Sequence, residues 1–250
     1  MRRRNRPRGR QPERPVIRGE LYLIPTPLGN IDPLPTTPEQ VRNTIARIEH
    51  YMAERPKSAV QFISRLGLGD RLDRMTFLTL DDRTPDEEIL TMLKQTEKGR
   101  SVGILSEAGC PAIADPGAQP VRLAHALGIR VVPLVGPSSI ALALMASGLN
   151  GQRFSFHGYL PAERNGRIEQ IARLERDSRA NGSTQIFIEA PHRNDHLIAD
   201  LLQSCNPETQ LCIATDLTTA TEQVRTMTVG AWRKKPPSIG KRPTIFLLQR

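Results

Sequence analysis

The feature that most constrains the fold is a regular alternation of short apolar runs and amphipathic segments, which begins at Gly19. The segments at 57–67 and 85–99 have helical spacing, with Gly at or near their ends. Strands that alternate with helices in this way pair in parallel through crossover connections, so the sequence predicts a mostly parallel α/β sheet. The apolar runs expected to form its strands lie at 20–25, 49–54, 74–80, 101–107 and 130–135.

The pattern changes after residue 148. Two helix candidates, at 163–179 and 191–204, lie among strand candidates, and the last three strands are close enough in sequence for antiparallel pairing. The sequence therefore predicts two α/β domains, 19–135 and 136–250, the second with a mixed sheet, that meet near residues 135–137. The strand candidates of the second domain lie at 153–160, 184–190, 210–217, 222–229 and 243–249.

Positive charge is concentrated at the N-terminus. The 250 residues carry a formal net charge of +9, and residues 1–18 alone hold eight Arg and one Glu, which is +7. Little apolar content and several Pro predict that residues 1–18 form an arm that is disordered in isolation. An Arg-rich arm neutralises phosphates and suits RNA as a partner, although a solubilising tail with no specific partner has the same composition.

Membrane insertion and extracellular chemistry are not expected. The longest apolar run, ALALMASGL, is too short to span a bilayer, and no apolar leader follows the charged N-terminus. The three Cys residues have no CxxC spacing, which argues against a zinc site or a disulfide framework. We expect a cytoplasmic protein without a metal.

Three loops of small residues follow predicted strands: PTPLGN (25–30), SEAGCPAIADPG (106–117) and VGPSSIA (135–141). None has a dinucleotide or phosphate-loop glycine pattern. Each one alone could be a tight strand-to-helix connection, but together at one sheet edge they favour a flat, partly apolar ligand held by main-chain groups. Within the second loop, Cys110 has no evident His partner and is expected to be a small loop residue, and Asp115 is expected to cap the next helix.

These loops, with FHGYLP (156–161) and IFIEAPHR (186–193), have the order and spacing of the tetrapyrrole methylase superfamily. From about Gly19 to the C-terminus the chain resembles the ribosomal branch of that superfamily, the ribosomal RNA small subunit methyltransferases I, as a shorter paralogue. The resemblance implies a two-domain α/β enzyme, usually a homodimer, that binds S-adenosylmethionine (SAM) in the cleft between its domains. It implies methyl transfer to a ribose 2′-hydroxyl of small-subunit ribosomal RNA. A methylase of a small molecule such as a tetrapyrrole, and a non-catalytic RNA-binding relative, remain alternatives.

The resemblance also implies the residues of the SAM site. Main-chain groups of 108–110 would contact the methionine part, and Leu217, Pro243 and Thr244 would surround the adenine. The full set expected at the cofactor is Pro25, Leu28, Gly29, Ala108, Gly109, Cys110, Ile113, Ser138, Ser139, Glu189, Ala190, Leu217, Pro243 and Thr244.

Glu54, Lys57, Glu189 and His192 are the candidate catalytic residues, because a weakly acidic ribose hydroxyl benefits from a nearby base or an electrostatic partner. The ribosomal branch usually has an acidic-Thr-Arg-His run after its second strand. Here the stretch is AERPKSA (53–59), in which only Glu54 matches, so that either Lys57 replaces the missing cation or the acceptor differs. Each candidate also has a structural alternative: Glu189 as a carboxylate at a helix N-terminus, His192 in the first turn and Lys57 as a solvated lysine.

Overall fold

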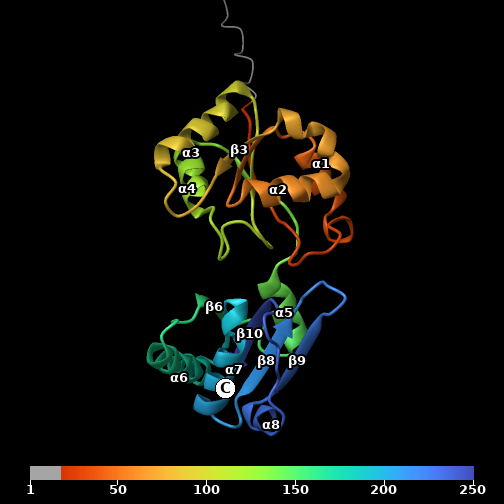
Figure 1. Cartoon of the computed structure of the whole chain (residues 1–250). Helices are drawn as coiled ribbons and strands as arrows, with labels where there is room; N and C mark the ends of the chain where they lie inside the picture. Colours follow the sequence, from red (N-terminus) through yellow and green to blue (C-terminus); the bar gives the residue numbers. More distant parts are fainter. Residues whose placement is uncertain (1–17) are drawn as a thin grey trace, which may run out of the picture.

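The computed structural model describes residues 18–250, and the arm predicted at 1–18 lies outside them except for Arg18. The chain forms two α/β domains, each built on a five-stranded sheet, and they lie one above the other in Figure 1. The elements of the upper, N-terminal domain are β1 (Leu21–Ile24), α1 (Glu39–Ile45), β2 (His50–Ala53), α2 (Pro56–Ile63), β3 (Thr76–Thr79), α3 (Asp86–Leu93), β4 (Val102–Leu105), α4 (Ala118–Ala126) and β5 (Val131–Pro133). Those of the C-terminal domain are α5 (Ser139–Ser147), β6 (Phe154–Tyr159), α6 (Arg164–Asn181), β7 (Thr184–Ile188), α7 (Asn194–Ser204), β8 (Gln210–Thr215), β9 (Gln223–Thr228), α8 (Val229–Lys234) and β10 (Thr244–Gln249).

The N-terminal sheet has the strand order β3-β2-β4-β1-β5, and every neighbouring pair is parallel. The predicted parallel α/β sheet is therefore confirmed. Successive side chains of a strand point to opposite faces, and the core divides accordingly. Ile24 and Tyr51 pack under α1 and α2, whereas Leu21 and Met52 pack under α3 and α4 (Figure 1).

The centre of this sheet requires a glycine. A Cβ at Gly103 would lie 2.8 Å from Ile24 Cδ1 and 2.9 Å from the ring of Tyr51. Such distances are too short for van der Waals contact, so Gly103 allows two large side chains to meet over β4. Tyr51 is fully buried there, and its hydroxyl donates to the carbonyl of Ile45 at 2.9 Å.

The C-terminal sheet is mixed, as predicted, with the order β6-β7-β10-β8-β9. The pairs β7–β10, β10–β8 and β8–β9 are antiparallel, which confirms antiparallel pairing of the last three strands, while β6 and β7 are parallel. Helices α6, α7 and α8 cover one face, and α5 packs on the other face next to β10 and β9. In the described range 18–250, no helix is both long and apolar enough to cross a membrane.

Candidate functional site

A cavity of about 250 Å³ lies between the two domains, where the loops after β1, β4 and β5 end. This volume is close to the roughly 300–1,000 Å³ usual for small-molecule sites, and the position is the usual one in open α/β sheets. We call it the interdomain cavity. Its walls are Leu28, Ala108, Gly109, Cys110, Ile113, Ala114, Asp115, Ser138, Ser139, Ile140, Phe156, Tyr159, Ile188, Glu189, Pro191, Ala214, Leu217, Pro243, Thr244 and Ile245.

The loop at 106–117 is tied to the loop after β1. The amide of Thr26 donates to the carbonyl of Gly109 at 2.9 Å, and the amide of Gly109 donates back to Thr26 at 3.0 Å. The hydroxyl of Ser106 also donates to the Gly109 carbonyl, at 2.5 Å. Gly109 has φ 79°, and a Cβ there would lie 3.2 Å from Leu28 Cδ2. A side chain at position 109 would therefore press against Leu28 in the cavity wall, and glycine avoids this contact.

Four non-glycine residues of the described part have positive φ: Ala112 (64°), Ala114 (61°), Asp216 (49°) and Thr218 (71°). All four belong to two loops that contribute to the walls of the interdomain cavity, one through Ala114 and the other through Leu217. Residues in this conformation cost roughly 1–3 kcal/mol each and cluster at ligand sites. The strain supports a binding role for both loops.

Glu189 places a buried carboxylate in the C-terminal wall. Its Oε1 accepts from the amide of Ala190 at 2.7 Å and from the guanidinium of Arg193 at 2.9 Å and 2.5 Å. Its Oε2 is buried and has no hydrogen-bond partner within residues 18–250. A buried acceptor without a donor is costly, so this oxygen is suited to a donor group of a ligand in the cavity.

Asp115 is a second cavity carboxylate, and it was not among the predicted site residues. Its Oδ2 is buried and also lacks a partner among the described residues. Burial raises the pKa of Asp115 to about 6, with the charges of Glu54 and Glu107 adding to the rise and the amides of Ala108 and Glu107 opposing it. The expectation that Asp115 caps the next helix was wrong: within the described chain, α4 has Gly117 at its N-cap and no side-chain cap. Gly117, at φ 145°, lies between Asp115 and the first residue of α4, Ala118.

Most of the residues predicted at the cofactor lie together in the walls of the interdomain cavity. Three do not line it. Gly29 lines a second cavity, Pro25 is buried against Gly136, and Ala190 lies behind Glu189, to which its amide donates. The predicted residues that line the interdomain cavity are Leu28, Ala108, Gly109, Cys110, Ile113, Ser138, Ser139, Glu189, Leu217, Pro243 and Thr244.

Cys110 has the character of a small loop residue. Its thiol donates to the carbonyl of Pro137 at 3.5 Å, and burial raises its pKa, so it is held as the thiol and not as the nucleophilic thiolate. Within residues 18–250, no group of three or more His, Cys, Asp or Glu side chains is placed to hold a metal ion.

The second cavity, of about 350 Å³, shares Leu28 and Ala108 with the interdomain cavity. Its other walls include polar groups of Asn30, Ser58 and Arg65. Arg65 holds the loop after β1, donating to Asn30 Oδ1 at 3.0 Å and to the carbonyl of Ile31 at 2.5 Å. The two cavities are therefore neighbours at these shared residues, and the second has the larger share of polar lining.

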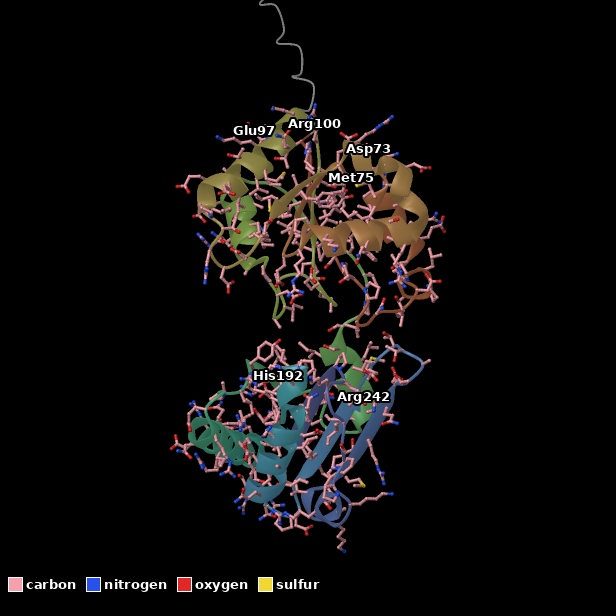
Figure 2. All side chains as sticks on the ribbon, in the orientation of Figure 1. Asp73, Met75, Glu97, Arg100, His192 and Arg242 are labelled. Carbon is pink, nitrogen blue, oxygen red and sulfur yellow. The ribbon has the colours of Figure 1, made fainter. Side chains whose placement is uncertain are left out.

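The candidate catalytic residues are more dispersed. Glu54 is partly buried at the end of β2 and acts on Asp115 through its charge. Lys57 is exposed in the first turn of α2 and, in the part of the chain described, lines neither cavity, although the adjacent Ser58 lines the second. His192 is exposed, one residue after the cavity residue Pro191, on the face of the C-terminal domain that is turned to the N-terminal domain (Figure 2).

Comparisons with known proteins cover most of the chain. The sequence profile of the family described as tetrapyrrole (corrin/porphyrin) methylases matches residues 20–232. The chain is 30% identical to ribosomal RNA small subunit methyltransferase I of Escherichia coli over 92% of this chain and 78% of that protein. It is 34% identical to the protein of the same description from Xylella fastidiosa, over 82% of this chain and 71% of the relative.

Solved structures share the fold. The methyltransferase CobJ superposes with a TM-score of 0.61 at 16% identity, covering 93% of this chain and 94% of CobJ. A uroporphyrin-III C-methyltransferase of Thermus thermophilus, solved with S-adenyl homocysteine, superposes with a TM-score of 0.54 at 16% identity, over 93% and 98% of the two chains.

Proposed function

The chain belongs to the tetrapyrrole methylase family and is a SAM-dependent methyltransferase, and we propose that its acceptor is a ribose 2′-hydroxyl of small-subunit ribosomal RNA. The identity of the acceptor is inferred from the similarity to ribosomal RNA small subunit methyltransferases I, which extends over most of both chains. A cytoplasmic location and a homodimer are part of the same proposal.

The residues present fit SAM. The methyl donor offers hydrogen-bond donors on its ammonium group and ribose, and Glu189 Oε2 is a buried acceptor with none among residues 18–250. The main chain of 108–110 is open to a ligand because its residues are small, and Leu217, Pro243 and Thr244 would hold the adenine. When bound, SAM supplies a methyl group on a sulfonium centre.

The second cavity supports RNA as the acceptor. Three cations, Arg55, Lys57 and Arg65, are exposed at the start of α2 and just beyond its end. Arg65 lines this cavity, and Lys57 precedes the lining residue Ser58. Exposed cations around a polar cavity suit the phosphates on either side of a target nucleotide. We propose that the nucleotide enters here, so that its ribose lies beside Ala108, which both cavities share.

The protein would then contribute chiefly by positioning. Transfer from a sulfonium is an in-line displacement, so holding the hydroxyl and the methyl group in line, away from water, supplies much of the rate. In this proposal Lys57 contacts a phosphate or steadies the developing alkoxide, and Glu54, Glu189 and His192 border the site from the two domains.

The test uses the full-length protein and SAM with a labelled methyl group. Small ribosomal subunits from a strain without this methylation are incubated in parallel with a metabolite extract, and the labelled rRNA is digested to nucleosides. A labelled 2′-O-methylnucleoside is the expected product. Label in a tetrapyrrole would support the small-molecule alternative, and SAM binding without transfer to either would support a non-catalytic role.

A further inference from the structure

We propose that Asp115 is the general base of this enzyme and takes the proton of the acceptor hydroxyl. This inference rests on the proposed function, because it requires a hydroxyl as the acceptor. Three observations carry it: the position of the side chain, its unpartnered oxygen and the charges around it.

Asp115 lines the interdomain cavity on its N-terminal side. The loop folds back, so that this carboxyl lies near the amides of Glu107 and Ala108, and those two residues line the second cavity. Asp115 is therefore where the cofactor side and the acceptor side of the site meet.

The oxygen that would accept the proton is available. Oδ2 of Asp115 has no hydrogen-bond partner in the described range and is shielded from solvent. The other cavity carboxylate is engaged differently, since Glu189 is held in an ion pair by Arg193 at 2.5 Å. Oε1 of Glu189 is thus occupied by Arg193 and the Ala190 amide, and its Oε2 is the oxygen proposed to bind a donor group of SAM. Because Glu189 Oε2 is assigned to the cofactor, Asp115 Oδ2 is, among the residues described, the unpartnered carboxylate oxygen of this cavity that can take the acceptor's proton.

The charged side chains that act on Asp115 are carboxylates. Glu54, at the end of β2, and Glu107, in the same loop, both disfavour the ionised form of Asp115, as does burial, and together they raise its pKa to about 6. The cation Arg55 pairs with Glu107 at 4.0 Å and is largely exposed, and no cation among residues 18–250 contributes to the pKa shift of Asp115. Glu189 faces the same cavity from the other domain. With this pKa Asp115 is mostly ionised at neutral pH yet is a stronger base than an ordinary carboxylate.

The hydroxyl proton passes to Asp115 Oδ2 as the ribose oxygen forms a bond to the methyl carbon. The carbon–sulfur bond breaks with its electron pair on sulfur, which leaves neutral S-adenosylhomocysteine and a methyl ether. The protonated Asp115 then returns its proton to solvent.

Asp115→Asn tests the proposal, because the amide keeps the size of the side chain but cannot take a proton at neutral pH. We expect kcat on small subunits to fall about 10²–10⁴-fold, the usual contribution of a general base. The Kd for SAM, measured by calorimetry, should change less than about threefold. For the wild type, the rate should rise with pH to a plateau above about pH 6, and the residual rate of Asp115→Asn should lack that limb.

Glu107→Gln is the matched variant. It removes one charge that raises the pKa of Asp115, so the rising limb of its pH profile should shift to lower pH. Carboxyl NMR of the SAM-free protein should show one Asp that titrates near pH 6 and is lost in Asp115→Asn, a readout that does not depend on activity.

Full turnover by a folded Asp115→Asn protein would overturn the assignment, as would a large loss of SAM affinity, which would put Asp115 on the cofactor. If the wild type itself places no label on small subunits, the proposed function fails, and the base assignment fails with it. Labelling by the wild type therefore shows whether the proposed function holds, and only if it does can the Asp115→Asn variant refute the base assignment by itself.

Discussion

At the residue scale, main-chain conformation restricts which residues can stand in the cavity loops more than side-chain chemistry does. Gly109 is the clearest case, because it has both a positive φ and a neighbour at 3.2 Å from the position of a Cβ. The sequence showed that this loop is small, and from that a ligand against its backbone was predicted. It could not show that Asp115 points back to the loop, because this depends on positive φ at Ala112 and Ala114, which alanine rarely adopts.

We expect Gly109→Val to weaken SAM binding at least tenfold, since a branched side chain would enter the cavity beside Leu28. The control is Gly128→Val. Gly128 has φ 66°, a comparable backbone cost of roughly 1–3 kcal/mol, but no described atom lies within 4 Å of its Cβ position and it lines neither of the two described cavities. Calorimetric titration of both variants with SAM distinguishes an effect of backbone strain, which both share, from obstruction of the cavity, which only Gly109→Val causes. Equal SAM affinities in the two would refute contact between the cofactor and this loop.

At the scale of elements, the apolar runs predicted the described strands of both sheets within two residues at each end, and buried parallel strands are easy to find because they are almost continuous apolar runs. β4, with all four residues buried, is the simplest example. The parallel pairing of β6 with β7, which α6 connects, follows the same crossover rule as the N-terminal sheet, although the sequence predicted only that the second sheet is mixed. The helical segment predicted at 57–67 starts one residue after the observed start of α2 at Pro56, a residue type that suits the first turn of a helix.

Because α2 begins beside the second cavity, its first-turn lysine should act on RNA and not on SAM. We expect Lys57→Ala to raise KM for small subunits about three- to tenfold and to reduce the salt slope of RNA affinity by roughly 0.7–0.9, the value for one phosphate contact. SAM affinity should be unchanged. Lys94→Ala is the control, because Lys94 is also exposed but precedes β4, at the opposite edge of the sheet. Identical KM values for the two variants would argue against an RNA contact of Lys57.

At the scale of the whole molecule, the start of the described chain and the site lie at opposite edges of the N-terminal sheet. Gly19 is fixed at the amino edge, where its amide donates to the carbonyl of Thr96 at 2.8 Å, whereas the interdomain cavity lies at the carboxyl edge (Figure 1). The proposed boundary of the domains, near residues 135–137, falls where the chain passes from β5 to α5.

Deletion of residues 1–17 removes seven Arg and one Glu, a net charge of +6, and no described element. We expect unchanged SAM affinity, weaker RNA binding and a shallower dependence of RNA affinity on salt. Binding is measured with small subunits at several salt concentrations. Parallel salt dependences for the full-length and shortened proteins would identify the arm as a solubilising tail.

The interdomain cavity also has a thermodynamic consequence. Each sheet has its own core on both faces, so the two halves can melt separately, but a ligand in this cavity touches both. We expect the SAM-free protein to show two overlapping heat-absorption peaks in scanning calorimetry. SAM at 100 times its Kd adds about 2.7 kcal/mol to the folded state and should merge them into one, whereas a shift of only one peak would show that SAM is held by a single domain. The supply of the methyl donor would then set the lifetime of the enzyme as well as its rate.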